Sequence, residues 1–345
     1  MHLRSHCRHR QARPVLAFAA WFVAQFAVMA VVFGLSEQPA LAQIDDYPSS
    51  AVRIVLPLPP GAANDASLRL IAERLSKQWG QPVIVDNKPG ASTIIGTEAV
   101  VRAPADGYTL LATISLIAQN QVLRKKLPYD AVRDLTPVTQ INRPQLVLYV
   151  RGNLPAQNIA ELVSYAAKHP GQLNFGTWGL GSAAHLILEK FRIDKGVQMT
   201  HVPFRGAADI TNAVVARQVD VGVGELLSTR QFFETGQLRA IGVTGPSRVS
   251  VLPDAETLAE AGVQGFESYS WFGLFAPANT SPRIVRKLSD AINAVQSDPA
   301  LKKRLTEEMF APPAFTTPEE FAKSFQQEIA KWSSVIAATG VTIEE

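Results

Sequence analysis

Cysteine is the scarcest residue of this 345-residue chain, and the only one, Cys7, lies near the N-terminus. Beyond that position the sequence has no thiol, which excludes disulfides, thiolate metal sites and a cysteine nucleophile from the rest of the chain. A fold of this length must therefore be held by its hydrophobic core. About 300 residues can bury ~75% of their unfolded surface, usually as two domains.

An excess of charge is also missing once the N-terminal 42 residues are set apart. The chain has 33 basic and 30 acidic side chains, and the first 42 residues hold four of the former and one of the latter, so 29 of each remain. This balance lacks the basic surface that nucleic-acid binding requires. Apolar runs of membrane-spanning length are equally absent beyond these 42 residues.

Residues 1–42 have the layout of a secretory signal peptide. A cationic stretch from Arg4 to Arg13 precedes an apolar run from Val15 to Leu35, and Ala40-Leu41-Ala42 supplies an A-x-A cleavage site. Cleavage there starts the mature chain at Gln43 and predicts a periplasmic location. The apolar run is longer than the usual ~7–15 residues, so an uncleaved membrane anchor is the alternative.

Short β-branched runs alternate with amphipathic helical stretches from Val52 onward. Arg53 to Leu58 reads as a buried strand, Pro59-Pro60-Gly61 ends it, and Ala66 to Trp79 has a helical apolar period. A second series of the same kind begins after Pro144. The pattern predicts an α/β protein with two lobes, each a doubly wound, mostly parallel sheet flanked by helices.

Beyond Pro277 the pattern predicts helices only, each opened by a proline, over residues 282–296, 299–309 and 318–338. We expect these helices to return to the first lobe. The predicted division is therefore a first part of lobe 1 at 43–143, lobe 2 at 144–270 and the remainder of lobe 1 at 271–345.

Two loops follow a strand and open a helix, at Pro57 to Asp65 and at Phe175 to His185. Their small residues let a ligand approach the backbone, and unpaired N–H groups at a helix start favour an anion. In a doubly wound lobe such loops lie at the ligand crevice. A carboxylate held there by N–H groups and by the hydroxyls of Thr177 and Ser182 is one reading, and two plain tight connections are the other.

These loops also carry a family resemblance. The stretches PLPPGAANDASLRL, LPYDAVRDLTPV, NFGTWGLGSAAHL, HVPFRG and WFGLFAPANTSP occur in an order and spacing that resemble the Bug-type receptors of tripartite tricarboxylate transporters. The resemblance covers Tyr47 to Glu344. It implies a two-lobed flytrap fold without catalysis, a small carboxylate ligand between the lobes, and permease subunits as partners. We expect a monomer without a cofactor.

The resemblance also implies a set of ligand contacts. Carried over by position, these are Leu58, Gly61, Ala62, Asp65, Ser92, Thr177, Gly181, Ser182, His185, Phe204 and Gly206. One departure concerns the end of a later strand, where relatives usually have Phe-Asp and this chain has Val223-Gly224, followed by Glu225. Glu225 is a substitute candidate, with a solvated loop glutamate as the alternative. The loss of the aspartate argues against an α-amino acid, and the ligand's identity stays open.

Other chemistries lack their minimum parts. His185 and Glu189 have the spacing of two metal ligands on a helix, but the sequence suggests no third ligand, so no metal is expected. Gly179-x-Gly181 resembles a dinucleotide loop without the acidic residue that would hold a ribose, and no G-x-S-x-G or phosphate-binding loop is present. An exported enzyme acting on an organic acid, or a ligand sensor for a signalling partner, are the rival functions.

Overall fold

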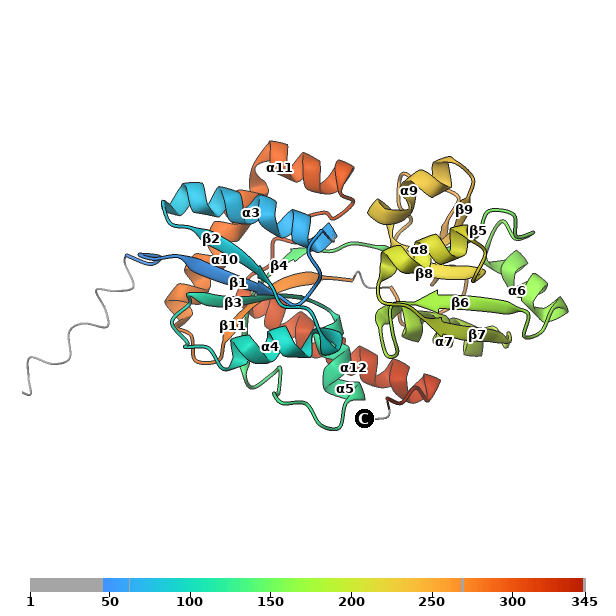
Figure 1. The fold of residues 1–345 in the computed structure, drawn as a ribbon, viewed down its shortest axis with the longest axis horizontal. Helices are drawn as coiled ribbons and strands as arrows, with labels where there is room; N and C mark the ends of the chain where they lie inside the picture. Colours follow the sequence, from blue (N-terminus) through green and yellow to red (C-terminus); the bar gives the residue numbers. More distant parts are fainter. Residues whose placement is uncertain (1–45, 62, 268–269, 344–345) are drawn as a thin grey trace, which may run out of the picture. The chain divides into compact units, whose positions relative to one another are not determined.

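The computed structural model describes residues 46–61, 63–267 and 270–343, which form two mixed sheets surrounded by helices (Figure 1). The predicted signal peptide and Ala62 lie outside the described residues. The first sheet has the order β2-β1-β3-β11-β4, with bounds Val83–Asn87, Val52–Leu56, Thr109–Ile114, Phe272–Pro277 and Leu135–Asn142. The second has the order β10-β9-β5-β8-β6-β7, with bounds Glu256–Thr257, Leu238–Val243, Leu146–Arg151, Val221–Glu225, Leu173–Thr177 and Met199–Pro203.

The two sheets repeat one topology. In the first, β1 pairs in parallel with β2 and β3, and β11 runs antiparallel between β3 and β4. In the second, β6 pairs in parallel with β7 and β8, and β5 runs antiparallel between β8 and β9. The predicted α/β class with mostly parallel sheets is confirmed. Each antiparallel strand is the first one formed after the chain crosses from the other sheet.

Helices cover both faces of each sheet. The α-helices are α3 Ala63–Trp79, α4 Ile94–Val101, α5 Leu116–Leu123, α6 Ile159–Lys168, α7 Ala183–Asp194, α8 Ala207–Val215, α9 Leu226–Glu234, α10 Pro282–Ser297, α11 Pro299–Lys303 and α12 Pro318–Thr339. A 3-10 turn, η1 Ala91–Thr93, precedes α4, and a π-helical turn, η2 Arg304–Glu308, follows α11. The helix expected at 299–309 is thus divided into α11 and η2.

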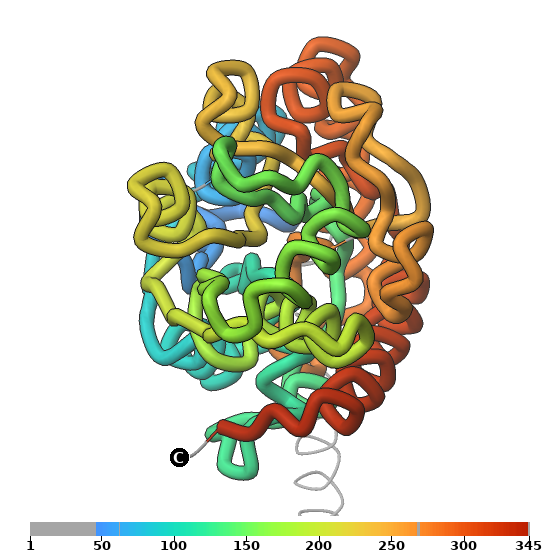
Figure 2. The backbone as a smooth tube through the Cα atoms, turned by 90° about the vertical axis from the view of Figure 1, so that its right-hand side faces the viewer, coloured from blue at the N-terminus to red at the C-terminus, as the bar shows by residue number. Residues whose placement is uncertain are grey.

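Local signals explain where the last helix starts and stops. Thr317 and Glu320 form a capping box around Pro318, and Gly340 ends α12 in the left-handed conformation. α12 packs along β4, α5 and α7, and its contact with α5 is visible at the lower edge of Figure 2. Both α10 and α12 therefore pack against β4 of the first sheet.

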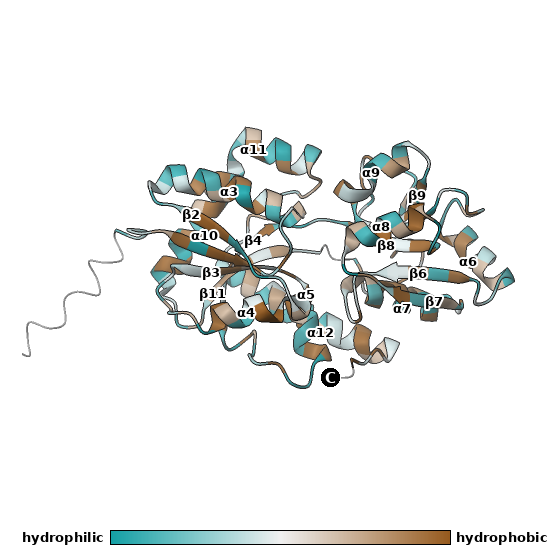
Figure 3. Ribbon diagram, viewed as in Figure 1, coloured by the Kyte–Doolittle hydropathy of each residue, from teal (hydrophilic) through white to brown (hydrophobic). Residues whose placement is uncertain are grey.

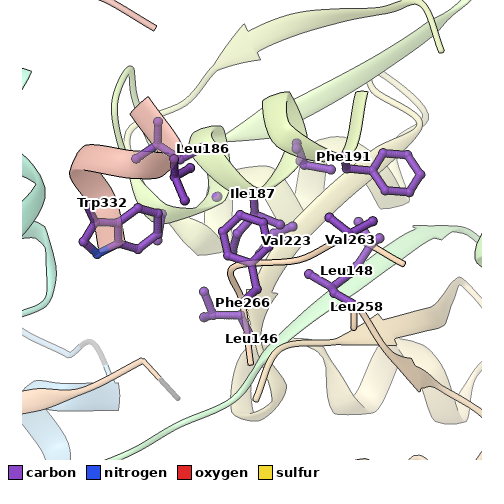
Figure 4. Packing of buried hydrophobic residues seen from close by; sticks show 14 of the residues in the cluster. Leu146, Leu148, Leu186, Ile187, Phe191, Val223, Leu258, Val263, Phe266 and Trp332 are labelled. Atoms are coloured by element: carbon purple, nitrogen blue, oxygen red, sulfur yellow. The ribbon is translucent and has the colours of Figure 1, made fainter. Parts of the chain in front are cut away.

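The hydrophobic core is continuous from one sheet to the other. Apolar residues concentrate on the strands in Figure 3, whereas α3 and α10 alternate apolar and polar residues. Trp332 of α12 packs against Phe266, and Ile187 of α7 belongs to the same buried cluster as Leu146 and Val223, which Figure 4 draws. Burying such a side chain contributes about 1.5–3 kcal/mol.

Among the described residues, no helix has both the length and the apolar character needed to cross a membrane.

Candidate functional site

The carboxyl ends of the parallel strands place several predicted residues at one edge of the second sheet. β6, β7 and β8 end at Thr177, Pro203 and Glu225, and α7, α8 and α9 begin shortly after them. Their helix starts gather at this edge, the position at which open α/β sheets bind ligands. Thr177, Phe204, Gly206 and Glu225 are thereby brought to the same end of the sheet.

The loop before α7 is built around Ser182 and His185. Gly179 and Gly181 have φ angles of 113° and 71°, which side-chain-bearing residues rarely adopt. The Ser182 hydroxyl donates to the Gly179 carbonyl at 2.7 Å and accepts from the His185 amide at 3.3 Å. The Gly181 amide donates to His185 Nδ1 at 3.1 Å. Ser182, Gly181 and His185 therefore hold the loop in shape with their own groups.

This arrangement leaves two backbone donors at the first turn of α7. Ser182 caps only the His185 amide, and the Leu186 amide bonds to the Ser182 carbonyl. The amides of Ala183 and Ala184 have no acceptor among the described residues, although these residues are only 7% and 0% exposed. Two buried amides at the positive end of a helix form an anion-binding arrangement. Sequence reasoning missed both residues.

Two histidines line the α7 side of this edge, and both are neutral near pH 7. His201 of β7 stacks on His185 with 4.1 Å between ring centroids, and its Nε2 lies 2.6 Å from the Thr177 hydroxyl. Burial, together with the neighbouring His185, lowers the pKa of His201 to about 4. Burial also lowers the pKa of His185. An anion at this edge is consequently met by neutral donors.

Asp65 braces the corresponding loop of the first sheet. Its carboxylate accepts hydrogen bonds from the Gly61 amide at 2.9 Å and from Asn87 Nδ2 at 3.0 Å, and it pairs with Arg69 at 3.0 Å. Burial opposes ionisation of Asp65, but the hydrogen bonds from Arg69, Gly61 and Asn87 outweigh it and lower its pKa. Leu58 contributes its carbonyl to Asn87. Asp65 therefore lies within the first turn of α3, which begins at Ala63, and its carboxylate closes the loop onto the Gly61 amide.

Ser92 lies in a strained turn. Ala91, Ser92 and Thr93 have φ angles of 45°, 54° and 77°, three consecutive left-handed residues that are not glycine. Asn120 of α5 holds the turn by donating to the Ser92 carbonyl at 2.8 Å. A left-handed conformation costs roughly 1–2 kcal/mol per such residue, and this kind of strain clusters at functional sites. The side chain of Ser92 is exposed.

Phe204 and Gly206 shape the β7–α8 connection. The Phe204 amide donates to the Thr177 carbonyl at 2.7 Å, which extends the β6–β7 pairing beyond the strand ends. Gly206 is the N-cap of α8 in an extended conformation. Both residues lie at the same edge as the α7 loop.

The surroundings of β8 bear on why this chain has Val223-Gly224 where relatives usually have Phe-Asp. A side-chain carbon at Gly224 would lie 3.3 Å from the ring of Tyr149, and one at Gly222 would lie 2.7 Å from it. Position 224 therefore faces Tyr149, on the side of the sheet opposite α7. Glu225 faces the other way and has no hydrogen bond or ion pair to its carboxylate among the described residues.

Metal binding finds no support in this geometry. His185 Nε2 is 4.0 Å from Glu189, and Glu189 pairs instead with Arg192 at 2.8 Å. Within residues 46–61, 63–267 and 270–343, no three His, Cys, Asp or Glu side chains converge to form a metal site.

Two mixed sheets of one topology, joined by two crossings, define the periplasmic-binding-protein class. Similarity to known proteins narrows this class to a family. The model of the tripartite tricarboxylate transporter family receptors matches residues 67–341, and the chain belongs to this family.

Individual relatives support the same family assignment. The chain is 30% identical to protein BugT of Bordetella pertussis, over 92% of this chain and 98% of that protein. The structure of Rpa4515 from R. palustris with adipate superposes with a TM-score of 0.79 at 34% identity, covering 86% of this chain and 99% of that one. MatC from Rhodopseudomonas palustris with bound malate gives a TM-score of 0.75 at 30% identity, covering 84% and 100%. The expected membership among Bug-type solute-binding receptors is confirmed.

Proposed function

We propose that this protein captures a small organic acid at the carboxyl edges of its two sheets and delivers it to the permease of a tripartite tricarboxylate transporter. The relatives that carry adipate and malate support a carboxylate ligand. The observation that carries the proposal is the pair of buried Ala183 and Ala184 amides without an acceptor. They are suited to the two oxygens of one carboxylate.

The other residues of the site then divide into two roles. In this proposal Thr177, Phe204, Gly206 and Glu225 approach the ligand from the second sheet, and Leu58, Gly61, Ala62 and Ser92 approach it from the first. Asp65, Gly181, Ser182 and His185 are positioning residues, because their polar groups are already engaged within the loops. The lobes that we propose are 43–143 with 271–345, and 144–270.

Binding is a better account of the site than catalysis. A hydroxyl–imidazole pair at the edge, Thr177 and His201, contains a histidine whose pKa of about 4 makes it a weak base. The other ring nitrogen of His201 has no carboxylate partner that would orient it among the described residues. We therefore propose a periplasmic, monomeric, non-enzymatic receptor. A receptor that signals to a membrane sensor would use the same site.

A substitution at the helix start tests the proposal. Ala183 is the first residue of α7, where proline is well tolerated, and Ser182 before it is extended with ψ of 161°. Ala183→Pro removes one free amide and keeps the helix. The wild type should bind adipate, malate or another acid of a thermal-shift panel, and the variant should bind the same acid ~10- to 100-fold more weakly by calorimetry.

Thermal stability is the control for this variant. Its melting temperature without ligand should equal or exceed that of the wild type, because the proline fits the first helical position. A wild-type protein that binds no acid of the panel contradicts the proposed function. Unchanged affinity of Ala183→Pro at unchanged stability places the carboxylate elsewhere.

A further inference from the structure

Glu225, the last residue of β8, lies on the face of the second sheet that α7 covers. Its register partner on β5 is Leu146, and Val223 faces Leu148 in the same ladder. Side chains two apart on a strand share a face, so Glu225 shares the face of Val223. Val223, Leu146 and Ile187 of α7 belong to one core cluster, as Figure 4 shows.

The strand register also shows how far along the sheet Glu225 lies relative to the loop before α7. Phe175 of β6 pairs in parallel with Val221 of β8. If this register continues, Glu225 is opposite position 179, two residues after β6 ends at Thr177. Adjacent strands are ~4.8 Å apart. Leu146, the register partner of Glu225, lines one small cavity together with Ala183 and Ile187. The backbone register thus places Glu225 at the end of the second sheet where α7 begins, and on the face that α7 covers.

Glu225 has no electrostatic compensation from the described part of the chain. Its side chain is partly buried, and burial alone raises its pKa. Titratable and charged groups on the elements around this end of the sheet are His185, Glu189 and His201, exposed Asp209 of α8, Arg230 and Glu234 of α9, which pair with each other, and Glu328 and Lys331 of α12. The two histidines are neutral near pH 7, Glu189 is paired with Arg192, and Lys331 lies 2.8 Å from Glu328. An ionised Glu225 would therefore be an isolated negative charge.

We propose that Glu225 determines the charge of the bound state: a carboxylate occupies the first turn of α7 only when Glu225 carries a proton, so each acid binds together with one proton. This inference rests on the proposed function. Two carboxylates that share a site disfavour double ionisation, and the protonated glutamate can then donate a hydrogen bond to the ligand.

Calorimetry with adipate and malate measures the coupled proton. Titrations at one pH in phosphate and in Tris, whose ionisation enthalpies differ, should show uptake of about one proton per ligand when Glu225 is ionised in the free protein. Affinity, measured from about pH 6 to 9, should fall as pH rises past the raised pKa of free Glu225, approaching tenfold per pH unit beyond it. Both histidines stay neutral over most of this range, since their pKa values are lowered.

Glu225→Gln is the decisive variant because glutamine imitates the protonated acid. It should bind the same ligand without proton uptake, with a flat pH profile, and more tightly than the wild type at pH 9. Glu234→Gln is the matched control, since Glu234 lies at the other end of α9, exposed and paired with Arg230 at 2.7 Å. This control should retain the wild-type pH profile and proton uptake.

The remaining outcomes separate the inference from the function. Wild-type binding of adipate or malate with no proton uptake and a flat profile overturns the role of Glu225 and leaves the receptor function standing. Binding of aspartate that Glu225→Gln abolishes also overturns it, because Glu225 would then pair with an ammonium group as an anion. Failure of the wild type to bind any acid contradicts the inference and the proposed function together.

Discussion

Replacing Ser92 by glycine should stabilise the protein, although it removes a side chain. Ser92 has φ of 54° and ψ of 47°, the left-handed conformation, and its side chain is exposed without a hydrogen bond among the described residues. A non-glycine residue in this conformation costs roughly 1–2 kcal/mol. Glycine avoids that cost but loses about 0.5–1 kcal/mol through the greater freedom of the unfolded chain.

The difference predicts a gain of about 0.5–1 kcal/mol for Ser92→Gly, measured as the free energy of unfolding in urea and accompanied by a rise in melting temperature of ~2 °C. Ala99→Gly is the matched control, because Ala99 lies within the adjacent helix α4 and should lose about 1 kcal/mol. If Ser92→Gly loses as much stability as Ala99→Gly, the turn is not strained and our account of it is wrong.

Two further predictions concern the α7 loop. Ser182→Ala should cost about 1 kcal/mol of stability through loss of the helix cap, and it should weaken the binding of any acid ligand. Calorimetric unfolding measures the first effect and binding titrations measure the second. Unchanged stability would mean that Ser182 does not cap α7. His201 should make the fold acid-sensitive: its pKa is about 4 in the folded protein against an ordinary 6.5, so the unfolded chain binds the proton more tightly and stability falls as pH drops from 6.5 towards 4. His201→Gln should reduce this fall in urea unfolding at several pH values, and an unchanged pH dependence would contradict the assignment.

The repeated topology was largely predictable from the sequence, but not the two antiparallel strands. Runs such as Val52–Leu56 and Leu146–Arg151 are almost wholly apolar, which identifies buried strands but not their direction. β4 was not anticipated, because Pro137 and several polar residues interrupt its apolar pattern. Helix α9 lacked a start signal because Glu225 is not a typical N-cap residue, whereas Ser115 before α5 is one but makes no capping hydrogen bond with its side chain.

The sequence indicated which loops form the site, but not which atoms in them are free to bind a ligand. The glycines around Gly179 and Gly181 pointed to the α7 start, whereas the donors that remain free belong to Ala183 and Ala184, whose side chains carry no chemistry. The available signal was their position one and two residues after an N-cap serine. The left-handed turn at Ser92 was equally hidden, because no glycine occupies it.

The equivalent topology of the two sheets makes their chemical difference informative. The loops after β1 and β6 occupy corresponding places, yet the first contains the carboxylate of Asp65, which its hydrogen bonds and Arg69 keep ionised, and the second contains two free amides and neutral histidines. An incoming carboxylate would meet the Asp65 carboxylate, already engaged with Arg69 and the Gly61 amide, at the first loop and two free amides at the second. In the proposed function we therefore expect the acid group of the ligand to bind at α7. The first sheet would then contact the rest of the ligand, where differences in chain length and polarity would be distinguished.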